Sequence, residues 1–155
     1  MAIRDFTKGN LVGVDLSPHM VEKARARNLY DHLDVADIGT YTPEKDKYSL
    51  VFTCDVFPYF GDLSGIFQSS FDALKPDGVF AFSNEMLEAS ESKGLPYKLR
   101  RESRFAHTKA YGNELAEKTG FELVAHETGT IRRNAGKDVI GSLCIFEKPA
   151  IRATF

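Results

Sequence analysis

The stretch Leu11–Met20, Leu-Val-Gly-Val-Asp-Leu-Ser-Pro-His-Met, is the feature that most constrains what this chain can fold into. Its first half is apolar and contains two β-branched valines, which favour a buried strand. Ser17 can cap a helix, and Pro18 suits the first helical position because its missing N–H costs nothing there. The stretch therefore predicts a strand, a tight turn and a helix, with Asp15 at the carboxyl end of the strand.

Asp15 has two interpretations on this stretch alone. Open α/β folds bind ligands where a strand ends and faces a helix N-terminus. In nucleotide-binding folds, a carboxylate at that place accepts hydrogen bonds from ribose hydroxyls. Asp15 can instead serve only to cap the turn, and the sequence leaves both interpretations open.

The size and charge of the chain exclude several classes of protein. We expect 155 residues to form a single domain, residues 1–155, and a net charge of -2 gives no reason to expect nucleic-acid or membrane binding. No apolar run reaches the roughly 18 residues that a membrane helix needs. Without a basic and apolar leader, we expect a cytoplasmic protein.

The cysteines and histidines do not predict a metal site. Cys54 and Cys144 lie in apolar, strand-like runs, which is typical of small buried hydrophobic residues. The four histidines are scattered without the spacing of metal ligands, so we expect no bound metal.

Strands and helices alternate along most of the chain, which predicts an α/β fold. We predict strands over 11–15, 32–37, 48–55 and 79–85 and helices over 18–28, 62–74 and 108–120. The run 48–55 is almost wholly apolar, which is typical of a central strand covered on both faces. Its turn continues over 56–60, which we expect to be an exposed apolar surface.

The chain ends differently from this alternation. Residues 121–132 and 139–146 flank a turn at 134–137, which predicts an antiparallel pair of strands. Residues 86–103 are polar and irregular, with a short strand expected at 97–100. Residues 1–8 have the pattern of the last turns of a helix.

Four segments together resemble a class I S-adenosylmethionine-dependent methyltransferase. They are Val12–Pro18, Val35–Ile38, Tyr48–Phe60 and Leu74–Ser83. Arg104–His107, Tyr111 and Gly120–Phe121 resemble the bacterial branch of that family associated with tetratricopeptide repeats. The resemblance implies a Rossmann-like sheet of seven strands with helices on both faces and an antiparallel C-terminal hairpin.

The resemblance also implies which residues bind S-adenosylmethionine and the methyl acceptor. Three strand ends would hold the cofactor: Asp15 and Leu16 at the ribose hydroxyls, Asp37 and Ile38 beside the adenine, and Cys54 and Asp55 near the methionine part. Tyr59, Phe60 and Tyr111 would lie near the acceptor. His107 and Glu85 are candidate bases, although His107 could instead form a structural hydrogen bond at the start of a helix.

The sequence departs from the family in one feature. The family opens with a strand and a Gly-x-Gly-x-Gly loop, and this chain contains no Gly-x-Gly. We therefore expect an N-terminally truncated domain that lacks the first strand and the glycine loop. Such a loss leaves backbone groups unpaired, at about 1–3 kcal/mol for each buried group. Either the strands at 11–15 and 48–54 pair directly, or the chain forms a homo-oligomer through its exposed sheet edges.

Three functions follow from these observations. The first is methyl transfer from S-adenosylmethionine to a small-molecule or protein acceptor, impaired by the missing loop. The second is a folded, non-catalytic remnant, and the third is a protein-interaction module that uses the turn at 56–60. A nicotinamide-dependent dehydrogenase is a weaker rival because its glycine fingerprint is also absent. The basic stretch Lys98, Arg100, Arg101 and Arg104 could hold an anionic acceptor, but such residues are more often the solvated face of a loop.

Overall fold

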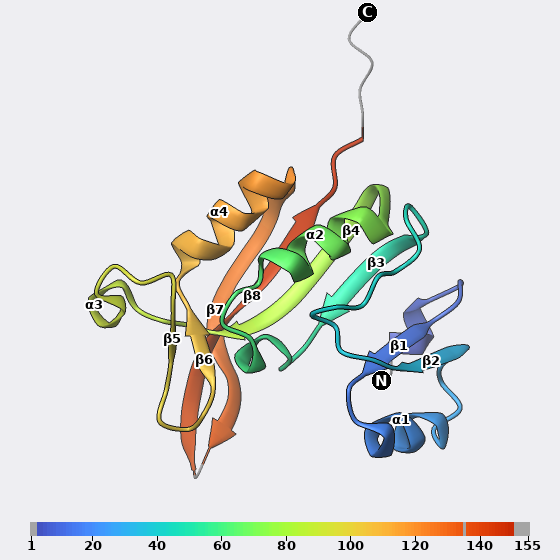
Figure 1. Cartoon of the computed structure of the whole chain (residues 1–155), viewed down its shortest axis with the longest axis horizontal. Coiled ribbons are helices and arrows are strands. Elements are labelled where there is room, and N and C mark those ends of the chain that lie inside the picture. The colour runs from blue at the N-terminus through green and yellow to red at the C-terminus, as the bar shows by residue number, and fades with distance from the viewer. Residues whose placement is uncertain (1–2, 135, 151–155) are drawn as a thin grey trace, which may run out of the picture. The chain divides into compact units, whose positions relative to one another are not determined.

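The computed structural model describes residues 3–134 and 136–150, and the chain forms two compact units with a boundary between Thr42 and Pro43 (Figure 1). Each unit has its own sheet and helices. Whether the two act as one domain stays a prediction. No helix in the described ranges is long and apolar enough to cross a membrane.

The first unit is a strand, a helix and a second strand. After a 3-10 helix at Ile3–Phe6, it contains β1 (Val12–Asp15), α1 (Pro18–Arg25) and β2 (His32–Val35). The two strands run parallel, in register from Val12 opposite His32 to Asp15 opposite Val35. The Ser17 hydroxyl accepts from the Met20 amide at 3.4 Å and caps α1, as the sequence predicts. The helix ends at Arg25, three residues earlier than predicted.

The second unit is built on a four-stranded mixed sheet. Its elements are β3 (Tyr48–Thr53), a 3-10 helix (Phe57–Tyr59), α2 (Ser64–Ala73), β4 (Leu74–Glu85), α3 (Ala89–Ser92), β5 (Tyr97–Leu99), β6 (Phe105–His107), α4 (Lys109–Thr119), β7 (Glu122–Asn134) and β8 (Lys137–Glu147). The strand order is β3-β4-β8-β7, with β3 parallel to β4 and β8 antiparallel to both of its neighbours. The predicted antiparallel ending is confirmed, and β5 and β6 form a separate small antiparallel pair.

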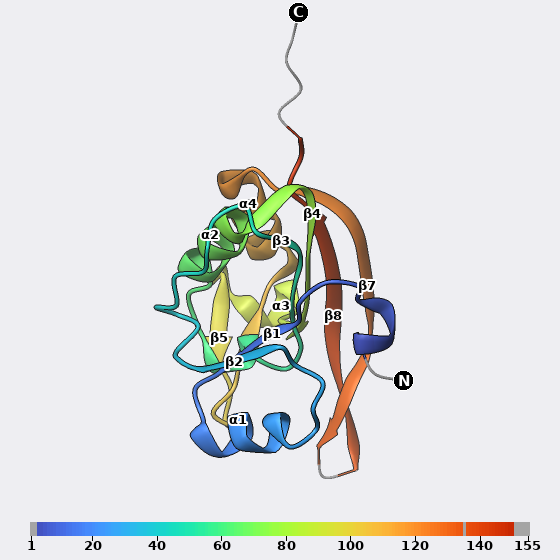
Figure 2. The same cartoon turned by 90° about the vertical axis from the view of Figure 1, so that its right-hand side faces the viewer.

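Within this second unit, α2 and α4 lie on the same face of the four-stranded sheet (Figure 2). An aromatic core fills the space between them and the sheet. Phe67 of α2 lies at its centre, with ring centroids 5.3 Å from Phe80 and 5.5 Å from Phe82 of β4. All three side chains are almost fully buried. Burying a large aromatic side chain contributes about 1.5–3 kcal/mol, so this cluster fixes the helices on the sheet.

Several predictions about individual segments are wrong. Strand β3 lies at the end of its sheet and not at the centre, and its Leu50 and Phe52 are 39% and 37% exposed. Cys54 is exposed, whereas Cys144 is buried as predicted. The turn at 56–60 is not an exposed apolar surface, because Phe57 and Pro58 are buried and only Tyr59 is largely exposed.

The described strands also differ from a single seven-stranded sheet. They form three sheets, of two, four and two strands. Within the described residues of each unit, β1 pairs with β2 and β3 with β4. The strands at 11–15 and 48–54 belong to different units, so their direct pairing stays a prediction. Residues 3–6 form a 3-10 helix where a helix end was expected, and Met1 and Ala2 lie outside the described residues.

Candidate functional site

Asp15 ends β1 with an exposed carboxylate. Its Oδ1 accepts a hydrogen bond from the Ser17 amide at 2.8 Å, which stabilises the turn before α1. Its other carboxylate oxygen makes no hydrogen bond to any residue that the structure describes. The neighbouring Leu16 side chain is 69% exposed. Asp15 therefore supports the turn and still offers an acceptor to a ligand, so the two sequence interpretations are compatible.

Asp37 and Ile38 follow β2, the parallel partner of β1. The Asp37 carboxylate is exposed, and its Oδ1 accepts from the Gly39 amide at 2.8 Å. The Ala36 amide donates to the Asp15 carbonyl at 3.1 Å and extends the pairing to this point. The first unit therefore presents two acidic side chains at the carboxyl end of its strand pair, where α/β folds bind ligands.

The second unit has its own cluster of charged residues at the carboxyl ends of β3 and β4. Asp55 follows β3 with a left-handed backbone, φ 58°, and an exposed carboxylate beside the exposed Cys54. Its amide donates to the Ser83 hydroxyl of β4 at 3.1 Å. Glu85 ends β4 and is only 2% exposed. A carboxylate this buried needs partners, because its desolvation otherwise opposes folding.

Three arginines supply those partners, and we call Arg100, Arg104 and Arg132 the arginine cluster. The Oε1 atom of Glu85 accepts from Arg104 Nε and from Arg132 Nη2, each at 2.6 Å. The Nη1 atom of Arg100 lies 3.9 Å from Oε2. Burial alone would raise the pKa of Glu85, but the hydrogen bonds and charges of Arg132 and Arg104 outweigh it and hold that pKa below its usual value.

Two of the predicted residues after β3 join this cluster. Arg104 Nη2 donates to the Asp55 carboxylate, and its Nη1 donates to the Tyr59 hydroxyl at 3.3 Å. The Arg104 guanidinium also lies over the Tyr59 ring, 5.1 Å from its centroid, which is the geometry of a cation–π contact. Tyr59 is 65% exposed, so it forms an accessible wall of the cluster. Phe60 is half-buried.

His107 and Tyr111 form hydrogen bonds with the residues just before α2. The buried His107 donates from Nε2 to the Gly61 carbonyl at 3.0 Å, and burial lowers its pKa. Its Nδ1 is buried and has no hydrogen-bond partner among the described residues. The Tyr111 hydroxyl donates to Asp62 and accepts from the Leu63 amide, both at 2.9 Å. Burial raises the pKa of Tyr111 to about 12.

The geometry thus gives His107 and Tyr111 structural bonds in this conformation. For His107 this agrees with the alternative interpretation from the sequence. Three assignments stay predictions: His107 as a base, Glu85 as a base, and the contact of Tyr111 with an acceptor.

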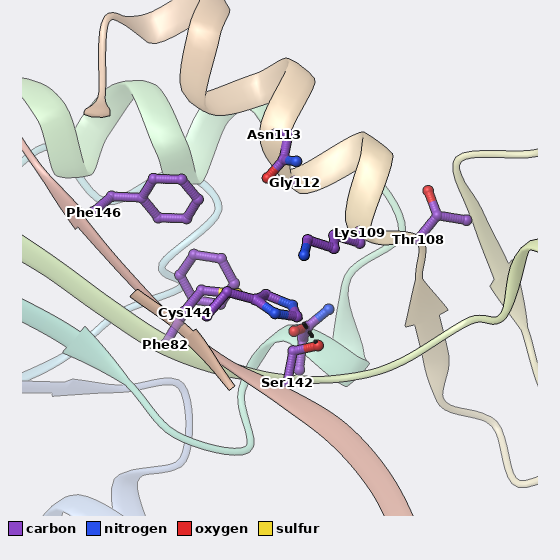
Figure 3. Close-up of a pocket in the computed structure, with 10 residues that line it drawn as sticks. Phe82, Thr108, Lys109, Gly112, Asn113, Ser142, Cys144 and Phe146 are labelled. Carbon is purple, nitrogen blue, oxygen red and sulfur yellow. Dashed lines mark hydrogen bonds between the residues drawn. The ribbon is translucent and has the colours of Figure 1, made fainter. Parts of the chain in front are cut away.

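A small hollow lies between α4 and the sheet (Figure 3). It has room for about one water molecule. Its lining residues are Phe82, Asn84, Thr108, Lys109, Gly112, Asn113, His126, Ser142, Cys144 and Phe146. The His126 ring and the Ser142 hydroxyl are hydrogen-bonded at 3.2 Å, and the buried Asn84 Oδ1 has no partner in the part of the chain that the structure describes. None of the residues predicted to bind cofactor or acceptor lines this hollow.

Arg132 was not among the candidates from the sequence. It is 47 residues from Glu85 in the chain, and no local pattern marks it. Arg100 and Arg104 were noted only as a basic stretch. Across the part of the chain that the structure describes, no group of three or more histidine, cysteine, aspartate or glutamate side chains could hold a metal ion.

Comparisons with known proteins agree on one family. A model of the methyltransferase domain matches residues 1–137. Malonyl-[acyl-carrier protein] O-methyltransferase from Acetivibrio thermocellus is 35% identical over 74 residues, 47% of this chain and 26% of the relative. Trans-aconitate 2-methyltransferase from Methylobacterium radiotolerans is 34% identical over 76 residues, 49% of this chain and 29% of the relative. The matched region thus spans less than a third of either relative.

Solved structures share the fold at low sequence identity. The methyltransferase in a complex with the Trm112 methyltransferase activator from Haloferax volcanii gives a TM-score of 0.74 at 18% identity, covering 98% of this chain and 77% of that one. N-methyltransferase NodS from Bradyrhizobium japonicum, solved with S-adenosyl-L-homocysteine, gives 0.68 at 18% identity, covering 91% and 67%. These likenesses confirm the α/β, Rossmann-like methyltransferase fold class.

Proposed function

Because the chain belongs to the methyltransferase-domain family, we propose that it transfers a methyl group from S-adenosylmethionine to a small-molecule or protein acceptor. The observation that carries this proposal is the family match over residues 1–137 together with the free carboxylate oxygen of Asp15 at the end of β1. The tetratricopeptide-associated branch, the truncation and a cytoplasmic location stay predictions.

The residues of the first unit fit the nucleoside part of this cofactor. Asp15 offers ribose hydroxyls a carboxylate oxygen that is unpaired within residues 3–134 and 136–150, and the exposed Leu16 offers apolar surface beside it. Asp37 and Ile38 would lie beside the adenine. When bound, the cofactor supplies an electrophilic methyl group on a sulfonium.

The second unit would bind and orient the acceptor. Its charged residues lie at the carboxyl ends of β3 and β4, and Tyr59 gives them an exposed aromatic wall. Methyl transfer depends largely on holding the acceptor in line with the methyl group, so rigid positioning groups suffice for much of the rate. Cys54 and Asp55 would lie near the methionine part of the cofactor.

Calorimetric titration of the full chain with S-adenosylmethionine tests the proposal. We expect binding, and we expect Asp15→Asn to weaken it by about tenfold to a hundredfold, since a hydrogen bond to a charged group contributes about 1.5–3 kcal/mol. Asp138→Asn, on the hairpin of β7 and β8, is the matched control and should leave the affinity unchanged. Absence of binding at millimolar cofactor would favour the second candidate, a folded and non-catalytic module of the same ancestry.

Association with other chains is the remaining part of the proposal. Strand β3 is an end strand without charged residues, and such edges pair readily with other strands. We therefore propose a homo-oligomer that forms through this edge. A protein partner is a further proposal, supported by the complex of the Haloferax volcanii methyltransferase with its activator.

A further inference from the structure

We propose that the arginine cluster binds a carboxylate group of the methyl acceptor. This inference rests on the proposed function and names the chemical class of its acceptor. The cluster lies at the carboxyl ends of β3 and β4, and its three guanidinium groups approach one buried carboxylate, that of Glu85. The structure thus concentrates positive charge at the place where the fold positions ligands.

The charges in the cluster do not balance at its centre. The three guanidinium groups face two carboxylates, those of Glu85 and Asp55. A third acidic group, Glu91, lies 3.3 Å from Arg100, but it is 56% exposed at the rim, where an ion pair is weak. The centre of the cluster therefore holds one more positive than negative charge, which the exposed Glu91 offsets only weakly, and a bound carboxylate would complete the balance.

Free donors remain on the two more exposed arginines. The Nη1 atom of Arg132 makes no hydrogen bond within the described ranges, and Arg132 is 23% exposed. The Nη1 atom of Arg100 is beyond hydrogen-bond distance of Glu85, at 3.9 Å, and Arg100 is 31% exposed. Guanidinium N–H groups match the two oxygens of a carboxylate, which makes arginine the usual residue for such recognition.

Glu85 and Tyr59 orient this site. The buried Glu85 fixes Arg104 and Arg132 through its Oε1 atom, so these guanidinium groups are held before a ligand arrives. Binding then costs less side-chain entropy than it would for mobile surface arginines. Tyr59 lies against Arg104 and is exposed, so it can contact the carbon skeleton that carries the carboxylate.

Titration of the full chain with malonate at low salt, followed by protein NMR, tests the inference without any cofactor. We expect malonate to bind at millimolar concentration and to shift amides near Glu85, Tyr59 and the arginine cluster. The neutral diamide malonamide should not bind, because it lacks the charge that guanidinium groups recognise. Inorganic phosphate has a similar charge to malonate and separates carboxylate recognition from general anion binding.

Two variants and two matched controls make the test specific. Arg100→Gln should weaken malonate binding by at least about tenfold, since it removes hydrogen bonds to a charged group. Arg132→Lys keeps the charge beside Glu85, so it should remain folded, but it loses the two-pronged donor geometry and should also weaken binding. Arg101→Gln and Arg133→Gln remove charge from adjacent residues outside the cluster and should leave binding unchanged.

Three outcomes would overturn the inference: malonate binding that both variants leave unchanged, equal binding of malonamide, or tighter binding of phosphate than of malonate. A failure of the proposed function looks different. If malonate binds through Arg100 while S-adenosylmethionine does not bind, the anion site stands and the methyl-transfer proposal falls.

Discussion

Replacement of Glu85 by glutamine should destabilise the second unit by about 3–5 kcal/mol at pH 7. Glu85 is 2% exposed and accepts hydrogen bonds from Arg104 and Arg132 at 2.6 Å. Removal of one partner from a buried ion pair costs about 3–5 kcal/mol, and here the half-buried Arg104 and Arg132 would lose their most buried acidic partner. A folded domain has a net stability of about 5–15 kcal/mol, so the loss is large.

Urea unfolding followed by far-ultraviolet circular dichroism measures this loss, since the chain contains no tryptophan for fluorescence. With a denaturant slope of about 2 kcal/mol per molar urea, the midpoint should fall by about 1.5–2.5 M. Glu91→Gln is the matched control. Its carboxylate is 56% exposed and pairs with Arg100, so the change should be no more than about 0.5 kcal/mol.

Comparison of wild type with Glu85→Gln isolates the contribution of Glu85 to the pH dependence of stability. The pKa of Glu85 lies below its usual value in the folded state. The ionised group therefore stabilises the fold above its unfolded pKa, about 4.3, and this stabilisation is lost as the pH falls through the folded value. The difference between wild type and Glu85→Gln should be full at pH 7 and shrink below about pH 4. A difference under about 1 kcal/mol at pH 7, or one that stays constant to pH 3, would refute the reasoning.

Two further predictions concern the sheet. Leu50→Lys places a charge on the apolar end strand β3 and should reduce self-association, measured by sedimentation at increasing concentration; an unchanged sedimentation profile of a self-associating chain would place the interface elsewhere. Gly141→Ala should destabilise the second unit by about 3 kcal/mol in the same urea assay, because a Cβ there would lie 2.3 Å from the Asn84 carbonyl oxygen. A Cβ added at Gly129, its cross-strand partner, would meet no other described residue within 4 Å, so Gly129→Ala should have little effect. Equal stability of the two variants would contradict this account.

The elements whose ends are set by local chemistry were predictable from the sequence. Ser17 and Thr108 cap α1 and α4 through their side-chain oxygens, and Gly120 ends α4 with a φ of 91°. Each of these residues acts on backbone groups within four positions of itself, so the sequence alone contains the information.

Burial was harder to predict because it depends on which distant elements pack beside a strand, and the sequence of the strand does not specify them. The apolar run 48–55 is typical of a central strand, yet β3 has a partner strand on only one side within its sheet. Near the start of β4, the backbone of Asp77 takes a positive φ, 61°. Gly78 is required for space, since a Cβ there would lie 2.7 Å from the Lys75 carbonyl oxygen.

The arginine cluster shows why the candidate site could be predicted only in part. Glu85 lies opposite Gly141 of β8, and Arg132 lies opposite Val139 of the same strand. The register of β7 shifts between Thr130 and Arg132, where two residues of β7 advance against one of β8. Because side chains alternate between the faces of a strand, this bulge reverses the direction in which Arg132 would otherwise point.

Gly141 and the bulge depend on each other. The side chain of the extra residue, Ile131, approaches Gly141 so closely that a Cβ at that position would lie 2.5 Å from its Cδ1 atom. A side chain at position 141 would thus push Ile131 away, disturb the bulge and turn Arg132 from Glu85. The arginine cluster therefore depends on Gly141, which carries no functional group and lies nine residues along the chain from Arg132, the arginine that it positions. We therefore expect Gly141→Ala to weaken malonate binding as well as to lower the stability of the second unit. If the cluster did not depend on the bulge, the variant would lower the stability and leave malonate binding unchanged.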